Sequence, residues 1–184
     1  MQGTAIAQPN IALIKYWGKR DIERNLPAVG SISITLRELH TRMQVEFDDT
    51  LATDRLSVNE EPAEKMLPRL SACLDRVAGQ SRPRAHIAST CNFPIAAGLA
   101  SSASSFAALT VAAARAAGKS FDVARLASLA GQASGSAARS LYGGFVELEN
   151  AGDDIACHSL CDADDWPLTV VLAITAVSYT HLRA

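Results

Sequence analysis

The sequence has no strong excess of charge, because 17 Lys and Arg residues against 19 Asp and Glu residues give a net charge of −2. This balance gives no electrostatic reason to expect binding to nucleic acid or to an anionic membrane. No apolar run reaches the length that spans a membrane. Residues 1–6 have no basic region and no long apolar run, so they do not read as a signal peptide. We therefore expect a cytoplasmic protein with neither nucleic acid nor membranes among its partners.

The cysteines lack the spacing of a disulfide framework, and a chain of this size does not need one. Reduced thiols are expected at all four positions, Cys73, Cys91, Cys157 and Cys161. Cys157, His158 and Cys161 have the spacing of half a metal site, but no second ligand pair accompanies them. Partly buried thiols on a strand and in the turn after it are the favoured interpretation.

The composition is that of a folded domain: 184 residues, 48% hydrophobic and 20% charged, are neither disordered nor a coiled coil. Hydrophobic periodicity predicts strands over residues 4–15, 31–36, 41–47, 56–59, 84–89, 145–149, 155–160 and 168–174. It predicts helices over residues 64–78, 99–117 and 121–132. We expect the second and third strands to pair, and 145–149 to run antiparallel to 155–160. Early strands, then helices, then more strands indicate an α+β fold.

Residues 94–105 are the stretch around which the rest of the chain is organised. A turn that contains Pro94 and Gly98 leads directly into an alanine-rich stretch with helical spacing. Gly98 can adopt backbone angles that a side chain forbids, and it allows another group to approach closely. The first turn of the following helix offers unpaired N–H groups at the positive end of the helix dipole, and nearby serines add hydroxyls. The stretch predicts either a phosphate site or a serine-rich cap before a buried helix.

The usual phosphate-loop motif is absent. Gly118, Lys119 and Ser120 resemble the end of that motif, but the position of its first glycine is occupied by Ala113. These residues also end the predicted helix, where Gly118 is typical of a C-terminal stop. Any nucleotide site must therefore be of another type.

Three clusters share anion-binding groups in a small-residue setting. They are Lys15 with Tyr16, Lys19 and Arg20; residues 98–105; and residues 134–139. Together they favour a substrate that carries several phosphates. The alternative is that Lys15 and Arg20 lie at a solvated strand end and that Arg139 is an ordinary helix-cap cation.

A serine hydrolase is disfavoured. The sequence has no G-x-S-x-G motif, and nothing indicates that any of its four histidines lies near the serines of residues 101–105.

Four segments carry a resemblance to the diphosphomevalonate decarboxylase family of the GHMP kinase superfamily. The family's N-terminal signature is similar to residues 11–21, 25–27 and 31–36. Its phosphate loop resembles residues 92–103, its third block residues 134–144, and a weaker block residues 68–74. The resemblance implies the left-handed βαβ-type α+β fold of GHMP enzymes, with an antiparallel or mixed sheet packed on helices.

The resemblance also implies an activity. The family uses ATP and Mg²⁺ to phosphorylate the tertiary hydroxyl of mevalonate 5-diphosphate. Phosphate and CO₂ then leave, which gives isopentenyl diphosphate in the mevalonate pathway of isoprenoid biosynthesis. Neutralisation of the spread negative charge is the main physical demand of such a phosphoryl transfer.

The resemblance assigns roles position by position. Lys15 would stabilise charge at the reacting phosphoryl group, Arg139 would lie near the substrate carboxylate, and Arg69 would hold the substrate diphosphate. The substrate pocket would comprise Tyr16, Trp17, Gly18, Lys19, Arg69, Ser134, Gly135, Ser136, Ala137, Ala138 and Arg139. The ATP phosphates would lie against Ala97, Gly98, Leu99, Ala100, Ser101 and Ser102, with Ser101 or Ser102 near Mg²⁺.

Two departures from the family pattern set the expected boundaries. Residues 1–175 would form the ATP- and substrate-binding domain, and the family's C-terminal half, with its general-base aspartate, would be absent from this chain. Residues 176–184 do not resemble the family and are expected to be foreign. The chain by itself should show little or no activity, and the full-length form could be a homodimer.

Two alternatives stay open. The chain could belong to a phosphomevalonate decarboxylase or a mevalonate 3-kinase of the same superfamily. It could also be a non-catalytic nucleotide- or phosphate-binding module that functions at this length.

Overall fold

The computed structural model describes residues 1–15, 18–95 and 97–173. The strands are β1 (Gln2–Ala7), β2 (Asn10–Ile14), β3 (Lys19–Asp21), β4 (Leu26–Pro27), β5 (Ser31–Thr35), β6 (Thr41–Asp48), β7 (Arg55–Val58), β8 (Glu61–Pro62), β9 (Arg84–Cys91), β10 (Phe145–Ala151) and β11 (Asp154–Cys161). The helices are η1 (Glu64–Met66), α1 (Leu67–Ala78), α2 (Ser101–Ala116), α3 (Val123–Ala133) and η2 (Ala137–Leu141), where η denotes a short 3₁₀ segment.

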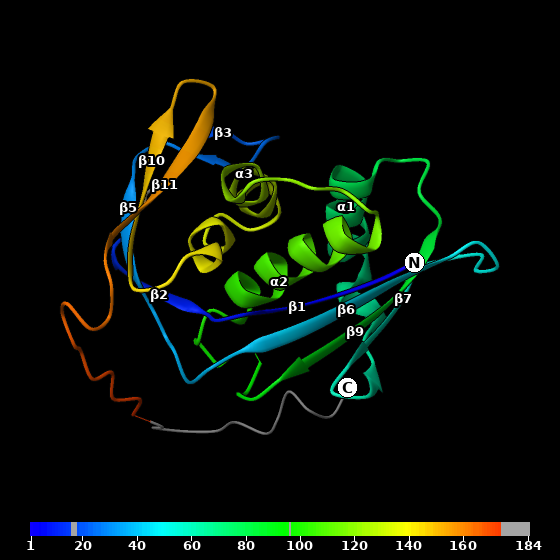
Figure 1. Ribbon diagram of the computed structural model, residues 1–184, viewed down its shortest axis with the longest axis horizontal. Helices are drawn as coiled ribbons and strands as arrows, with labels where there is room; N and C mark the ends of the chain where they lie inside the picture. Colours follow the sequence, from blue (N-terminus) through cyan, green and yellow to red (C-terminus); the bar gives the residue numbers. More distant parts are fainter. Residues whose placement is uncertain (16–17, 96, 174–184) are drawn as a thin grey trace.

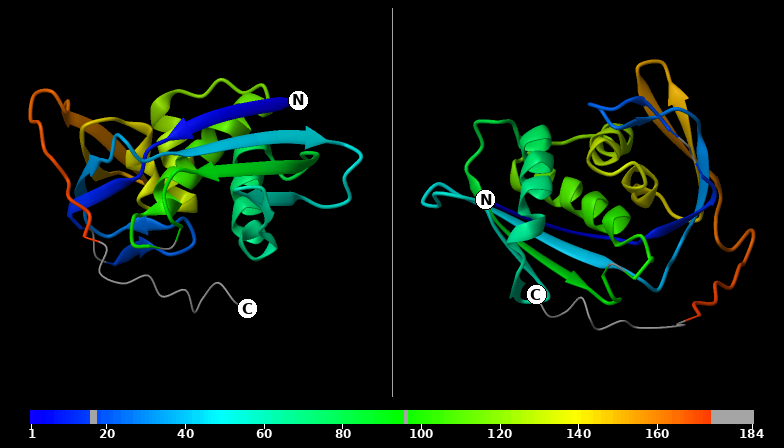
Figure 2. Two further views of the ribbon diagram at one scale, coloured as in Figure 1. Left: turned by 90° about the horizontal axis from the view of Figure 1, so that it is seen from below. Right: turned by 180° about the vertical axis from the view of Figure 1, so that it is seen from behind.

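Two sheets enclose the helices in an angle. One sheet has the strand order β1-β6-β9-β7-β8 and the other β11-β10-β5-β2, while β3 and β4 form a small separate ladder. The three α-helices lie over one face of the first sheet, and the second sheet stands beside them where β1 leads into β2 (Figure 1). Figure 2 shows the helices in the concave angle between the two sheets. This arrangement is the expected α+β fold with a mixed sheet packed on helices.

Helix α2 is the centre of the core. Its small side chains are buried on most sides, and it packs across β1 and β6. Close approach requires Gly3 on β1, because a Cβ at this position would collide with the Ala112 carbonyl oxygen and the Ala116 nitrogen. The alanine content that predicted a helix therefore also sets how closely the sheet can lie against it.

The single strand expected over residues 4–15 is wrong. It is two strands in different sheets, because the chain bends at Gln8 and Pro9 between β1 and β2. Pro9 has no N–H to donate to a ladder, and its carbonyl accepts a 2.9 Å hydrogen bond from the Leu36 N–H.

The expected pairing of residues 31–36 with 41–47 is also wrong. β5 pairs with β2 and β10, whereas β6 pairs with β1 and β9. Residues 36–40 carry the chain from one sheet to the other. Alternation of polar and apolar residues shows which face of a strand is buried but not which strand lies beside it.

The strand expected over residues 168–174 is not formed at residues 168–173, and residue 174 lies outside the described part. Its apolar side chains, including Leu168 and Val171, are exposed. Within the described residues no strand pairs with this segment, and an apolar run without a ladder partner does not make a strand.

The other predicted elements are confirmed with small shifts of their ends. β10 and β11 form the expected antiparallel pair, and the three predicted helices correspond to η1 with α1, α2 and α3. Gly118 has φ +64° just beyond α2, and its N–H donates to the Arg115 carbonyl. This geometry confirms a helix stop at Gly118 rather than a phosphate motif.

Candidate active site

The segment predicted to be a phosphate loop connects β9 to α2. Gly98 has φ +80°, which confirms the need for glycine there, and Ala100 also lies in the left-handed region with φ +51°. Ala100 is the N-cap of α2, and no side chain caps that end of the helix. The Ala103 N–H already donates to the Ala100 carbonyl at 2.8 Å, so the N–H groups of Ser101 and Ser102 are the first-turn donors that the phosphate-site prediction requires.

A cavity of about 420 Å³ lies against this end of α2, and we call it the phosphate-loop cavity. Its polar lining residues are Lys65, Arg69, Ser89, Ser101, Ser102 and Ser105. Its apolar lining is Met43, Leu56, Val58, Met66, Leu70, Ile95 and Phe106. A pocket with an apolar lining and a cationic, hydroxyl-bearing rim suits a ligand that has both an apolar ring and phosphates.

Arg69 joins the phosphate-loop cavity to the third block of the sequence. Its guanidinium lies 4.9 Å above the centre of the Phe106 ring, and its Nη2 donates to the Ala133 carbonyl at 3.3 Å. The next residue, Ser134, ends α3 and begins the third block. The fold thus places Arg69 between the predicted ATP residues and the predicted substrate residues.

The third block is held against β2 by Asn10. The buried Asn10 side chain donates to the Ser136 carbonyl at 2.9 Å and to the Ser140 hydroxyl at 2.8 Å. Ser134, Gly135 and Ser136 are half-buried, whereas Ala137 and Ala138 are fully buried. Asn10 was not among the predicted site residues, although a polar amide at the head of an apolar run is a signal that could have identified it.

Arg139 is a buried cation, with only 1% of its surface exposed. Its guanidinium donates to Ser33 Oγ at 2.9 Å, to Asn10 Oδ1 at 3.3 Å and to Ser31 Oγ. Ser31 and Ser33 come from β5 of the second sheet, which explains why sequence spacing did not find them. This environment differs from that of an ordinary helix-cap cation, which would lie in solvent.

Cys157 lies close enough to Arg139 to experience its charge. Burial raises the pKa of the Cys157 thiol to about 12, although the positive charge of Arg139 opposes the rise. Such a thiol stays neutral, and thiolate is the form that binds metals. Among the residues described, no group of three or more His, Cys, Asp or Glu side chains could hold a metal ion.

The first predicted cluster is divided by the fold. Lys15 is exposed, with its ammonium 3.2 Å from the Ala12 carbonyl, and Lys19 is exposed on β3. Arg20 donates to Asn150 Oδ1 and to the carbonyls of Gly152 and Asp154, so it holds the β10–β11 turn. Tyr16 and Trp17 lie outside the described residues, as do residues 176–184 of the predicted tail.

The loop that follows Lys19 nevertheless returns to the third block. Gly18 has φ +72°, and its carbonyl accepts from the Ala28 N–H. Asn25 Nδ2 donates to the Gly131 carbonyl at 2.9 Å, near the end of α3. This bond fixes residues 18–28 to the helix that leads to Ser134.

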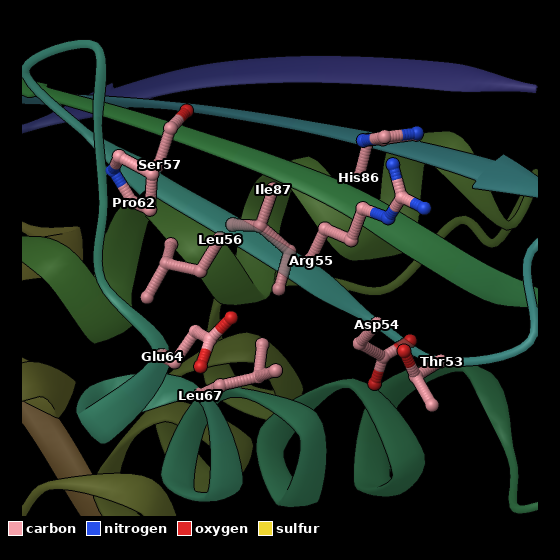
Figure 3. Close-up of a pocket in the computed structure, with 10 residues that line it drawn as sticks. All are labelled: Thr53, Asp54, Arg55, Leu56, Ser57, Pro62, Glu64, Leu67, His86 and Ile87. Atoms are coloured by element: carbon pink, nitrogen blue, oxygen red, sulfur yellow. The ribbon is translucent and has the colours of Figure 1, made fainter.

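A larger cavity of about 730 Å³, the β7 cavity, lies between β7 and the start of α1 (Figure 3). Arg55 and His86 line one side of it and Glu64 the opposite side, while Asp54 is already paired with Arg82 at 2.7 Å. The β7 cavity contains none of the predicted site residues. Its mixed charges offer no concentration of anion-binding groups, so the phosphate-loop cavity is the better candidate.

Comparison with known proteins agrees with this geometry. A family model described as the diphosphomevalonate decarboxylase-like N-terminal domain matches residues 7–160. The chain belongs to this family. It is 41% identical to the diphosphomevalonate decarboxylase of Eremothecium gossypii over 181 residues, which cover 88% of this chain and 46% of that protein. The human diphosphomevalonate decarboxylase is 38% identical to this chain, and the matched region covers 93% of this chain and 48% of the human protein.

Solved structures of the family have the same fold. Mevalonate diphosphate decarboxylase from Staphylococcus aureus is 41% identical with a TM-score of 0.79, over 86% of this chain and 50% of that one. A structure of MDDEF in complex with MVAPP, AMPPCP and magnesium is 35% identical with a TM-score of 0.81. The match covers 90% of this chain and 52% of that one. The chain therefore spans about half the length of the family members that it matches.

None of the helices in the described part of the chain combines the length and the hydropathy needed to cross a bilayer.

Proposed function

We propose that this chain is the ATP- and substrate-binding part of a diphosphomevalonate decarboxylase. The reaction would be the ATP-dependent decarboxylation of mevalonate 5-diphosphate to isopentenyl diphosphate. The observation that carries the proposal is the phosphate-loop cavity, where an uncapped helix N-terminus faces Arg69 and Lys65. Two further findings support the proposal. Relatives about twice as long as this chain are named diphosphomevalonate decarboxylase, and one solved structure holds MVAPP, AMPPCP and magnesium.

The residues of this chain would bind and orient the two substrates. The open N–H groups of α2 and the hydroxyls of Ser101 and Ser102 would hold the ATP phosphates, while the apolar lining would take the base. Arg69, between this cavity and Ser134, would hold the substrate diphosphate. The cationic and hydroxyl side chains of the cavity would make charge-assisted hydrogen bonds to the phosphates.

Arg139 would position the substrate carboxylate at the end of the third block. Because its guanidinium is fixed by Asn10, Ser31 and Ser33, it cannot turn to follow a leaving group. With only 1% of its surface exposed, this fixed cation would act on a nearby carboxylate through its charge and would not follow it, which suits a group that must leave as CO₂. Lys15 would neutralise charge on the phosphoryl group, and the general base would be an aspartate outside this chain.

The residues at the rim fit a magnesium ion that arrives with the nucleotide. Mg²⁺ is usually held by one or two protein oxygens together with substrate phosphates and water. Ser101 and Ser102 offer hydroxyl oxygens, and the described residues contain no acidic cluster that would hold the ion alone. When bound, Mg²⁺ would withdraw charge from the phosphate oxygens. ATP and Mg²⁺ are accordingly the proposed co-substrate and cofactor.

The test is ATP-dependent release of CO₂ from carboxyl-labelled mevalonate 5-diphosphate. It is run on this chain and on the chain extended through its genomic reading frame. We expect release from the extended chain only. Consumption of mevalonate or its monophosphate without CO₂ release from the diphosphate would favour a 3-kinase or a phosphomevalonate decarboxylase. Tight ATP binding with no turnover in either form would favour a binding module.

Arg69 provides a variant with a matched control on the same helix. Arg69→Gln removes the proposed diphosphate contact and should raise the KM for mevalonate 5-diphosphate about tenfold, more than the KM for ATP. Arg76→Gln removes another arginine of α1, whose Nη1 is 3.4 Å from the Ala72 carbonyl, and should leave both constants unchanged. A larger effect of Arg69→Gln on ATP would assign the guanidinium to the nucleotide instead.

A cytoplasmic location and a homodimer of the full-length form stay predictions. The free thiols of all four cysteines support the predicted cytoplasmic location.

A further inference from the structure

Two buried hydroxyls connect the phosphate loop to the first sheet. Thr41, the first residue of β6, and Ser104, in the first turn of α2, have no exposed surface, and their oxygens are 2.7 Å apart. Ser104 belongs to the predicted anion-binding cluster of residues 98–105, whereas Thr41 was predicted only as part of a strand. Both lie beside the site rather than in it, because neither lines the phosphate-loop cavity.

This contact is part of a longer series of hydrogen bonds. Ser104 Oγ also lies 3.2 Å from the Ser101 carbonyl oxygen, which can only accept. Thr41 Oγ1 lies 3.2 Å from Cys91 Sγ, and in the contacts of Thr41 with Ser104 and with Cys91 either partner can be the donor. The result is a single chain of hydrogen bonds from Cys91 through Thr41 and Ser104 to Ser101, which we call the Thr41 chain.

The Thr41 chain ends on a residue of the proposed nucleotide site. Ser101 is the first residue of α2, and its side chain lines the phosphate-loop cavity. The first turn has local bonds, such as that from the Ala103 N–H to the Ala100 carbonyl at 2.8 Å, but no side chain caps it and Ala100 lies in the strained left-handed region. The Thr41 chain supplies a constraint from the sheet.

The entrance of the loop is fixed from the same corner. Asn92 Oδ1 accepts from the His40 N–H at 2.7 Å, and Asn92 Nδ2 donates to the Glu38 carbonyl at 2.8 Å. His40 and Thr41 are adjacent, so one corner of the chain holds both ends of the loop between Asn92 and Ser101.

We propose that Thr41 and Ser104 are positioning residues for the nucleotide site: the Thr41 chain holds the first turn of α2 where its N–H groups and Ser101 can meet the ATP phosphates. This inference rests on the proposed nucleotide site and adds the residues that orient it. Removal of the Thr41 hydroxyl leaves the Ser104 hydroxyl without its buried partner and releases the first turn from β6.

A matched control exists on the same helix. Thr110 is equally buried in α2, donates to the Phe106 carbonyl at 2.8 Å, and lies 3.6 Å from the Cys73 sulfur. It resembles Thr41 in burial, but its hydroxyl bonds to the Phe106 carbonyl rather than to a residue of the first turn of α2. Thr110→Val therefore reports the general effect of losing a buried hydroxyl.

The test compares Thr41→Val, Thr41→Ser, Ser104→Ala and Thr110→Val in the chain extended through its reading frame. The dissociation constant of Mg-AMPPCP and the hydrogen exchange of peptides within residues 98–108 are measured. We expect Thr41→Val and Ser104→Ala to weaken nucleotide binding about tenfold and to speed exchange in the first turn of α2. Thr41→Ser, which keeps the hydroxyl, and Thr110→Val should stay within about twofold of the unmodified protein.

Equal effects of Thr41→Val and Thr110→Val, or no effect of either, would overturn the positioning role. If the unmodified protein does not bind Mg-AMPPCP, the proposed function fails, and exchange alone then decides the inference. Faster exchange in Thr41→Val but not in Thr110→Val would preserve the Thr41 chain as the restraint on the loop, and unchanged exchange would refute it.

Discussion

Asp54 shows how a buried charge is kept ionised away from the site. Burial by itself would raise the pKa of its carboxyl, but hydrogen bonds from Arg82, Ser71 and the Ala85 N–H, with the charge of Arg82, lower it from 3.8 to about 2. Arg82 also donates to Asp75 at 2.9 Å. These bonds tie the start of β7 to the end of α1 and the start of β9.

The lowered pKa of Asp54 predicts a specific acid sensitivity. A carboxyl with a lower pKa in the folded state contributes stability above its unfolded pKa of 3.8, and loses it as the pH falls toward 2. Asp54→Asn should lower the free energy of unfolding at neutral pH by about 3 kcal/mol and flatten its decline between pH 4 and pH 2. Urea unfolding at several pH values measures both effects.

Glu149 is the control for Asp54. Its carboxylate lies 3.0 Å from His158 on the surface, with 55% of the side chain exposed. Glu149→Gln should change the free energy of unfolding by less than about 1 kcal/mol. An equal effect of the two substitutions would show that the Asp54 contact with Arg82 has no special contribution.

At the scale of elements, the sequence predicted most helices and strands but not their partners. Residues 31–36 and 41–47 were recognised as strands because alternation reports burial of one face. Their assignment to different sheets depends on the bend at Pro9 and on residues 36–40, which no local pattern encodes. The strand predicted over the apolar residues 168–174 was wrong at residues 168–173 for the same reason. Within the described chain these residues have no strand to pair with.

The phosphate loop gives a prediction at this scale. Gly98→Ala should lower the free energy of unfolding by about 1 kcal/mol, because a residue with a Cβ is strained at a φ of +80°. Steric overlap is not the cause, since a Cβ at this position would meet no atom within 4 Å. The loop would relax toward other angles, and Mg-AMPPCP would bind more weakly. Gly143 also has space for a Cβ but no positive φ, so Gly143→Ala should be neutral or slightly stabilising. Equal losses would show that backbone strain at Gly98 is not the cause.

At the scale of the whole molecule, the site is an assembly that only the fold creates. The sequence predicted the loop at Gly98, Arg69 and Ser134–Arg139 as separate blocks. The structure connects these blocks through Arg69. Its side chain lines the phosphate-loop cavity and contacts the end of α3, which leads to Ser134. Roles were not predicted for Asn10, Lys65, Ser31 and Ser33, because each reaches the site from a segment that is distant in the sequence, and spacing along the chain does not show such a contact.

The central claim is that nucleotide binds in the phosphate-loop cavity rather than in the larger β7 cavity. Hydrogen exchange of the chain extended through its reading frame, with and without Mg-AMPPCP, tests it most directly. Leu56 lines both cavities and Leu67 lines the β7 cavity, so peptides without these two residues are compared. We predict that nucleotide slows exchange in residues 97–106. Residues 53–55 and 85–87 of the β7 cavity should not change. Slower exchange around the β7 cavity, with no change at the phosphate loop, would contradict the account.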